Sequence, residues 1–307
     1  MRAFIFPGQG SQAVGMGVAL AEASPAARAV FEEVDEALGQ KLSALMAEGP
    51  QEELTLTYNA QPAIMANAIA TLRASGIDLA SKADFVAGHS LGEYSALCGA
   101  GAFDFATTAR LLKLRGQAMQ EAVPVGEGAM AALLGADLAL AQAIADAAAE
   151  GEVCTVANDN DPSQVVISGH RGAVERALGI AKEKGAKRAV LLPVSAPFHC
   201  PLMKPAADRM AQALADVDIA APAVPVYANV VAAPVSDPAE IRRLLVQQVT
   251  GMVRWRESVA AMAAAGVTHF VELGGKVLGP MVKRIAPDAT VTSVITIDDI
   301  DALVGEI

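Results

Sequence analysis

The sequence contains few of the residues that build disulfides, metal sites and aromatic cores. Its 307 residues include three Cys, four His and one Trp, and aromatic residues make up 4%. Cys98, Cys154 and Cys200 have no paired spacing, so disulfides and cysteine metal sites are not expected. The histidines form neither an HxxxH nor an HExxH pattern, which argues against a zinc site. The sequence therefore predicts neither a metal nor a bound cofactor.

Basic residues are also in the minority. The 23 Lys and Arg stand against 34 Asp and Glu, which gives a net charge of −11. Proteins that bind bulk nucleic acid or anionic membranes present a basic face, so we expect neither kind of partner. With 53% hydrophobic and 19% charged residues, the chain can bury a core, which argues against disorder.

Hydrophobic runs suited to a membrane are missing, although the mean hydropathy of +0.38 is high. Two uncharged stretches approach spanning length, residues 54–72 and 219–236, but both contain proline and asparagine. The apolar run at the N-terminus is far too short for a signal peptide. We therefore expect a cytosolic protein without membrane spans.

Apolar runs alternate with helical patterns along most of the chain. This alternation is typical of an α/β fold, with a largely parallel sheet covered on both faces. We expect its strands near residues 3–6, 84–87, 224–227, 268–272 and 290–295. We expect its helices near residues 24–39, 59–74, 92–98, 104–120, 203–216, 238–249 and 254–265.

The middle of the chain follows a different order. Strands are predicted at residues 129–134, 153–157, 164–168 and 188–192, with helices at 138–149 and 172–184. This is the β-α-β-β-α-β order of a ferredoxin-like unit. We therefore expect residues 126–195 to form an inserted small subdomain. Residues 1–125 and 196–307 would then form one discontinuous core.

A serine lies in the segment Gly88-His89-Ser90-Leu91-Gly92, which matches G-x-S-x-G between a predicted strand and a predicted helix. This strand–turn–helix context is what the nucleophile elbow requires. Ser90 would lie at a helix N-terminus, where free N–H groups favour developing negative charge. An ordinary serine in a glycine-flanked turn is the simpler alternative. We favour the nucleophile.

A nucleophilic serine needs a general base. His199 is the best candidate, because prolines on both sides fix its loop. A loop histidine without a partner would show the same pattern. His89 is adjacent to Ser90, so its side chain should diverge from that of Ser90 and have a structural role. His170 is expected to be a helix cap or a surface residue, and His269 is expected to lie in a strand. Since no acid stands out as a partner for His199, the sequence favours a Ser–His dyad held by a backbone group.

Arg115 lies in an apolar stripe of the helix predicted at residues 104–120, on the same face as Leu111 and Met119. A buried guanidinium needs an acid or an anionic ligand, and its planar fork suits a carboxylate. A structural ion pair, or an edge position that reaches water, is what the pattern by itself favours. Together with a nucleophilic serine, a carboxylate clamp would indicate an acyl donor that carries a free carboxylate.

The loop after the first predicted strand reads Gly8-Gln9-Gly10-Ser11-Gln12-Ala13 and formally fits the relaxed dinucleotide fingerprint. No second strand ending in an acid follows about 20 residues later, so we reject that interpretation. Its glycines would instead let backbone amides approach Ser90 as half of an oxyanion hole.

Five segments in order are FPGQGSQ (6–12), GHSLGEY (88–94), LLKLRGQAM (111–119), APFHCPLM (196–203) and QQVTGMVRW (247–255). Together they resemble the malonyl-CoA:acyl-carrier-protein transacylase family of type II fatty acid synthesis, over essentially the whole chain. The resemblance implies an α/β-hydrolase-like core with a ferredoxin-like insert. It also implies malonyl-CoA and an acyl carrier protein as partners, and we expect a monomer.

The resemblance also implies a role for each site residue. Ser90 would carry the malonyl group as an ester, and His199 would act as base and then as acid. Arg115 would bind the malonyl carboxylate. The remaining positions are Gln9 and Leu91, whose amides would form the oxyanion hole, Gln61 near the pocket, and Gln248, whose backbone carbonyl would orient His199.

Three other functions share parts of this pattern. A serine hydrolase or thioesterase would use Ser90 and His199 without Arg115. A free-standing acyltransferase of polyketide synthesis, or of a malonate decarboxylase, would share all the motifs. A non-catalytic module that docks a carrier protein is disfavoured by the intact Ser90 and His199.

Overall fold

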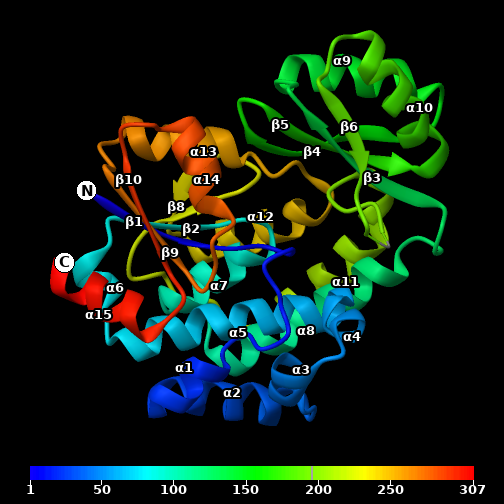
Figure 1. The fold of residues 1–307 in the computed structure, drawn as a ribbon. Coiled ribbons are helices and arrows are strands. Elements are labelled where there is room, and N and C mark those ends of the chain that lie inside the picture. The colour runs from blue at the N-terminus through cyan, green and yellow to red at the C-terminus, as the bar shows by residue number, and fades with distance from the viewer. Residues whose placement is uncertain (195) are drawn as a thin grey trace.

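Two β-sheets organise the computed structural model, which describes residues 1–194 and 196–307 (Figure 1). The strands of the larger sheet are β1 (Arg2–Phe6), β2 (Phe85–Gly88), β7 (Val226–Ala228), β8 (Ala233–Val235), β9 (His269–Leu273) and β10 (Thr290–Val294). They lie in the order β10-β9-β1-β2-β7-β8. All neighbouring pairs are parallel except β7 and β8, which form an antiparallel edge. The predicted, largely parallel sheet is confirmed, and β8 is an addition to it.

The smaller sheet is fully antiparallel and lies at the upper right of Figure 1. Its strands are β3 (Gly128–Leu134), β4 (Cys154–Asp161), β5 (Gln164–His170) and β6 (Arg188–Leu191), in the order β4-β5-β3-β6. Helices α9 (Leu138–Ala149) and α10 (Arg171–Glu183) pack together on one face. This is the predicted ferredoxin-like unit. The domain limits at residues 126 and 195 stay a prediction, and Ser195 lies outside the described residues.

The remaining helices surround the larger sheet. They are α1 (Val18–Ala23), α2 (Pro25–Leu38), α3 (Leu42–Glu48), α4 (Gln51–Thr55), α5 (Thr57–Ser75), α6 (Leu79–Lys82), α7 (Leu91–Gly99), α8 (Phe105–Glu121), α11 (Lys204–Ala215), α12 (Pro238–Thr250), α13 (Trp255–Ala264), α14 (Leu278–Ile285) and α15 (Ile297–Glu306), with the 3₁₀ helix η1 (Pro201–Met203). Side chains of Ser24, Asp104 and Asp237 cap α2, α8 and α12. These caps confirm the predicted starts of α2 and α8.

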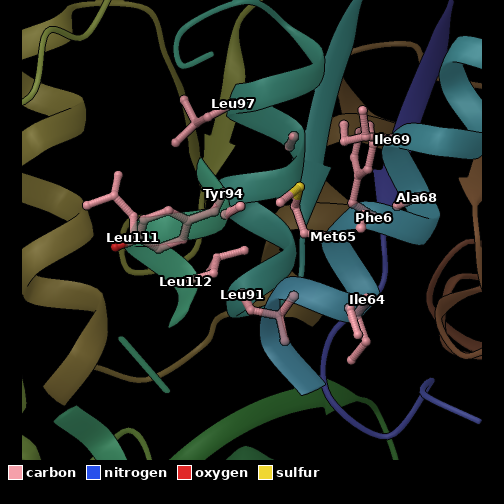
Figure 2. Packing of buried hydrophobic residues seen from close by; sticks show 14 of the residues in the cluster. Phe6, Ile64, Met65, Ala68, Ile69, Leu91, Tyr94, Leu97, Leu111 and Leu112 are labelled. Atoms are coloured by element: carbon pink, nitrogen blue, oxygen red, sulfur yellow. The ribbon is translucent and has the colours of Figure 1, made fainter. Parts of the chain in front are cut away.

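The two faces of β1 belong to different parts of the core. Because strand side chains alternate, Ala3 and Ile5 face the cluster of α13 and α14, which contains Trp255. Phe4 and Phe6 face the opposite cluster, built on α5, α7 and α8. Figure 2 shows how α5, α7 and α8 pack there around Phe6, Ile64, Met65, Ala68, Ile69, Leu91, Tyr94, Leu97, Leu111 and Leu112. Both faces of the parallel sheet are therefore covered.

Helix α5 explains the long uncharged stretch of residues 54–72. The helix is buried on nearly all sides, from Asn59 through Leu72, with Pro62 inside it. It packs between α2, α7 and α8, so it has no polar face of the usual kind. None of the helices in the described chain is both long and apolar enough to span a membrane.

Two ion pairs between buried carboxylates and partly exposed arginines join the smaller sheet to the larger part of the molecule. Asp159 and Asp161 of β4 are fully buried, and each lies 2.8 Å from an arginine, Arg256 on α13 and Arg284 on α14. Asn158 forms an isolated parallel bridge with Val253 just before α13. Strand β4 extends to Asp161, beyond the predicted end at residue 157, because these polar residues continue pairing with β5 through two irregularities. Its polar end thereby holds the two sheets together.

Glu272 at the end of β9 is a fully buried carboxylate that caps α14. Its Oε1 accepts hydrogen bonds from the amides of Val277 and Leu278, and its Oε2 accepts one from Gly279, at 2.8 to 3.0 Å. These are the amides that a helix N-terminus leaves without partners. Glu272 therefore fixes α14 against the carboxyl end of the sheet.

Replacing Glu272 with Gln should lower the free energy of unfolding by about 1–3 kcal/mol. A carboxamide can accept hydrogen bonds through its oxygen only, and its NH₂ group would face a backbone N–H that is itself a donor. Urea unfolding measures this change. The control is Glu240→Gln, which removes an exposed carboxylate paired with Arg243 and should leave the midpoint nearly unchanged. Equal midpoints for the two variants would contradict the capping role.

Candidate active site

Ser90 lies at the sharp turn between β2 and α7. Its backbone has φ 56° and ψ −113°, a strained conformation typical of a nucleophile elbow. The turn requires both flanking glycines. A Cβ on Gly88 would come within 1.9 Å of the Gly92 backbone, and one on Gly92 within 2.3 Å of the Phe6 carbonyl oxygen. This strained turn therefore places the Ser90 hydroxyl at the carboxyl end of the sheet.

His199 lies directly against this hydroxyl. Its Nε2 is 2.8 Å from Ser90 Oγ, although 109 residues separate the two in the sequence. Its Nδ1 lies 2.9 Å from the Gln248 carbonyl oxygen and 3.2 Å from that of Gly251. Since both oxygens only accept, we assign the hydrogen to Nδ1, and Nε2 is free to accept the Ser90 proton. The structure thus brings together a Ser–His pair oriented by backbone carbonyls.

The environment keeps this imidazole neutral. Burial and, after it, the positive charge of Arg115 lower the pKa of His199 to about 3, although the hydrogen bonds to the Gln248 and Gly251 carbonyls act in the opposite direction. The side chain is 4% exposed. At neutral pH His199 is therefore a base ready to take a proton.

Arg115 is buried beside the pair with neutral partners. Its Nη1 donates to Gln61 Oε1 at 2.8 Å, and its Nη2 donates to Gln248 Oε1 at 2.8 Å and to Ser90 Oγ at 3.1 Å. The side chain is 1% exposed, and its Nε has no hydrogen-bond partner among the described residues. No described carboxylate forms an ion pair with it. Of the three interpretations that the sequence left open, the structural ion pair is therefore not found in residues 1–194 and 196–307, and an exposure of 1% rules out an edge position that reaches water.

Two buried residues that the sequence analysis did not select complete the site. Asn229, just after β7, accepts from the Ser90 amide at 2.8 Å and donates to the Gly88 carbonyl at 2.7 Å. Glu93 on α7 accepts from the Asn229 amide and from Gln248 Nε2. The only sequence signal for Glu93 was its place in the GHSLGEY segment. Asn229 carried no signal, because only the fold brings it to the elbow.

Backbone amides near Ser90 are available for an oxyanion. The amide of Ser90 is occupied by Asn229, whereas that of Leu91, at the first position of α7, has no acceptor within the described chain. Gln9 lies in the loop after β1, which crosses the elbow so closely that a Cβ on Gly8 would be 2.7 Å from the His89 carbonyl oxygen. Gln9 and Leu91 both line the pocket at Ser90.

The pocket has a volume of about 300 Å³. Its lining combines Gln9, Gln61, Ser90, Leu91, Arg115 and His199 with residues from the smaller sheet and its connections, such as Met130, Asn158 and Leu192. Gln248 lies behind the wall and touches the site through its hydrogen bonds. Six of the seven predicted site residues thus line one cavity between the two parts of the molecule.

The other histidines make hydrogen bonds away from Ser90, and His89 is a packed, hydrogen-bonded residue as predicted. His89 Nε2 lies 2.8 Å from Asn160 Oδ1, and its ring packs near Trp255. His170 Nδ1 accepts from the Val153 amide, and His269 Nε2 lies 2.8 Å from the Thr292 hydroxyl. No group of three or more His, Cys, Asp or Glu side chains in the described residues is arranged to hold a metal ion.

Known proteins are similar to this chain in sequence and in fold. The family model of the acyl transferase domain matches residues 3–277. A malonyl CoA-acyl carrier protein transacylase of Bacillus subtilis is 51% identical over 288 residues, which cover 92% of this chain and 90% of that protein. The structure of an acyl-carrier-protein-S-malonyltransferase from Bartonella henselae is 54% identical and matches with a TM-score of 0.97 over 99% of each chain.

A further solved structure is that of a malonyl-transacylase in complex with its type II PKS acyl-carrier protein. It is 41% identical, with a TM-score of 0.95 over 100% of this chain and 99% of that chain. These likenesses extend along nearly the full length of each protein, through the elbow, the arginine helix and the inserted sheet alike. The chain therefore belongs to the acyl transferase domain family, among its malonyl CoA-acyl carrier protein transacylases.

Proposed function

We propose that Ser90 accepts a malonyl group from malonyl-CoA and passes it to the phosphopantetheine thiol of an acyl carrier protein, for fatty acid synthesis. The observation that carries this assignment is the buried Arg115 guanidinium, which lies 3.1 Å from the Ser90 hydroxyl without a carboxylate partner. A malonyl group attached to Ser90 ends in a carboxylate, the ion that this guanidinium lacks. Family membership and site chemistry lead to the same activity.

Acylation begins with attack of Ser90 Oγ on the thioester carbonyl carbon, while His199 Nε2 takes the hydroxyl proton. The C–S bond then breaks, and the CoA sulfur leaves with the proton from His199. In the second half, the carrier thiol gives its proton to His199 and attacks the ester. Its C–O bond breaks, and Ser90 recovers its proton. The two half-reactions give ping-pong kinetics without a cofactor of the enzyme's own.

We assign the oxyanion of each tetrahedral intermediate to the amides of Gln9 and Leu91. A free amide of this kind is typically worth about 3 kcal/mol of transition-state stabilisation. Gln61 and Gln248 hold the guanidinium of Arg115 from two sides, so that its fork faces the pocket. The Gln248 carbonyl also orients His199, in the position that an acid occupies in a triad.

The alternatives differ in what they would need. A hydrolase has no use for a buried cation beside its nucleophile, since that cation costs desolvation energy and selects nothing. Transfer to a polyketide carrier would run through the same site, so only the carrier protein distinguishes it. The monomeric state and the cytosolic location stay predictions.

Incubation with malonyl-CoA should give a protein whose intact mass has increased by one malonyl group. The adduct should be absent from Ser90→Ala, and holo acyl carrier protein should remove it. His89→Ala is the matched control at the elbow, and it should still form the adduct because His89 faces Asn160. Rapid release of free malonate without an adduct would instead identify a hydrolase.

Replacing Arg115 with Ala should lower the acylation rate with malonyl-CoA by about 10- to 100-fold, since a charge-assisted hydrogen bond to the malonyl carboxylate is lost. Acylation by acetyl-CoA should persist or rise, because no buried cation is then left without a partner. Arg110→Ala, at an exposed position on the same helix, is the control. An equal loss with both donors would rule out the carboxylate clamp.

The acylation kcat/KM should show no inflection near pH 6.5. Because the pKa of His199 is lowered to about 3, its neutral form predominates from pH 5 upward, and basic catalysis is lost only as the pH falls towards 3. Glu93, whose pKa burial raises to about 7, could also titrate, so the profile is repeated with Glu93→Gln. A loss centred near pH 6.5 that persists in this variant would show that His199 is not held neutral.

A further inference from the structure

Glu93 is a buried carboxyl group that the proposed chemistry does not use. It lies on the first turn of α7, three residues after Ser90, and is 3% exposed. Its side chain bonds to Asn229 and Gln248 behind the pocket lining, and no described Lys, Arg or His forms an ion pair with it. A buried acid without a salt bridge has to be held by hydrogen bonds.

Both of its hydrogen bonds reach the same oxygen. Glu93 Oε2 accepts from the Asn229 amide at 3.0 Å and from Gln248 Nε2 at 2.8 Å. Because Nε2 faces this acceptor, the amide oxygen of Gln248 must point the other way, where it accepts from Arg115 Nη2 at 2.8 Å. The carboxyl group therefore decides which end of the Gln248 amide faces the guanidinium.

The same two partners also hold the Ser90 peptide. Gln248 Nε2 donates to the Ser90 carbonyl oxygen at 3.0 Å, and Asn229 Oδ1 accepts from the Ser90 amide at 2.8 Å. Ser90 is in a strained conformation that its surroundings must impose, and these two bonds fix the peptide group on each side of it. Glu93 Oε2 is thus connected through the Gln248 side-chain amide to both Arg115 and the Ser90 carbonyl. It also holds the backbone N–H of Asn229, whose side chain accepts from the Ser90 amide.

We propose that Glu93 is a positioning residue for malonyl transfer, whose Oε2 orients the Gln248 amide and thereby holds Arg115 and Ser90 in one arrangement. This inference rests on the proposed function. The role depends on the position of the acceptor oxygen rather than on a full negative charge. Burial raises the pKa of Glu93 to about 7, so the group is only partly ionised near neutral pH. The carbonyl oxygen of a neutral carboxyl or carboxamide can also accept both hydrogen bonds, because it has two lone pairs.

Two variants separate the acceptor position from the charge. Glu93→Gln removes the charge and keeps an oxygen that can occupy the Oε2 position. Glu93→Asp keeps the charge and withdraws the oxygens by about 1.5 Å, the length of one C–C bond. We expect Gln to retain malonyl acylation within a few-fold of the parent. Asp should lose about tenfold or more, since a shift of about 1 Å in a positioned group has effects of this size.

The malonyl-to-acetyl ratio of acylation rates reports on Arg115 specifically. It should fall about fivefold or more in Glu93→Asp, since the charge-assisted hydrogen bond between Arg115 and the malonyl carboxylate is then misaligned, and it should stay near the parent value in Glu93→Gln. Glu272→Gln, which alters a buried carboxylate outside the pocket, should lower the unfolding midpoint without changing the ratio. All variants are compared with the parent by urea unfolding.

Three patterns of rates would contradict the positioning role of Glu93. Asp active with Gln inactive would show that the charge acts, and both variants active would show that neither feature matters. A loss in Asp with an unchanged ratio would show a merely structural role. Any of these results overturns the proposal. If the parent itself forms no malonyl adduct, the proposed function fails instead, which the adduct measurement shows separately.

Discussion

The buried charge of Arg115 is the constraint around which this site is arranged. Taking a guanidinium out of water is expensive unless an anion or several hydrogen-bond acceptors replace the solvent. Here the acceptors are the neutral oxygens of Gln61, Gln248 and Ser90. They hold the cation in place without neutralising it, and its Nε finds no described partner. An incoming carboxylate therefore supplies the negative charge that the protein does not place beside Arg115, and the selectivity of the site for such a donor follows from this.

The fold provides the rigidity that such an arrangement requires. Ser90 is presented by a strand and a helix that meet at a strained residue, with Gly88 and Gly92 in contacts that admit no side chain. The ion pairs Asp159–Arg256 and Asp161–Arg284 join the smaller sheet, which forms part of the pocket wall, to the helices on the other side of the larger sheet. The pocket is therefore bounded by two units that are tied together beside it, and its polar groups keep their spacing.

The sequence predicted the parts of this protein that depend on local pattern. Alternating apolar runs, N-caps and glycines located both sheets, and the elbow motif with the proline-flanked loop singled out Ser90 and His199. Local pattern could not find Asn229, because its partner Ser90 lies 139 residues away and its neighbourhood resembles a simple proline-rich loop. Local pattern also could not decide whether Arg115 forms an ion pair or binds a ligand carboxylate, since that depends on which carboxylates the fold brings near its guanidinium. Short helices such as α4 and α6, and the edge strand β8, are too brief for periodicity to reveal.

Arg115 also acts on the base, and this links recognition to reactivity. Its charge helps to keep the pKa of His199 low, second only to burial. A low pKa keeps the imidazole neutral but also makes it a weaker proton acceptor. A carboxylate bound against Arg115 cancels part of the positive field, so the pKa of His199 must rise in the malonyl complex. The base therefore strengthens when the correct donor is bound, whereas an acetyl group leaves the field unchanged. A single buried cation can in this way favour malonyl both by binding its carboxylate and by raising the basicity of His199 at the moment of attack.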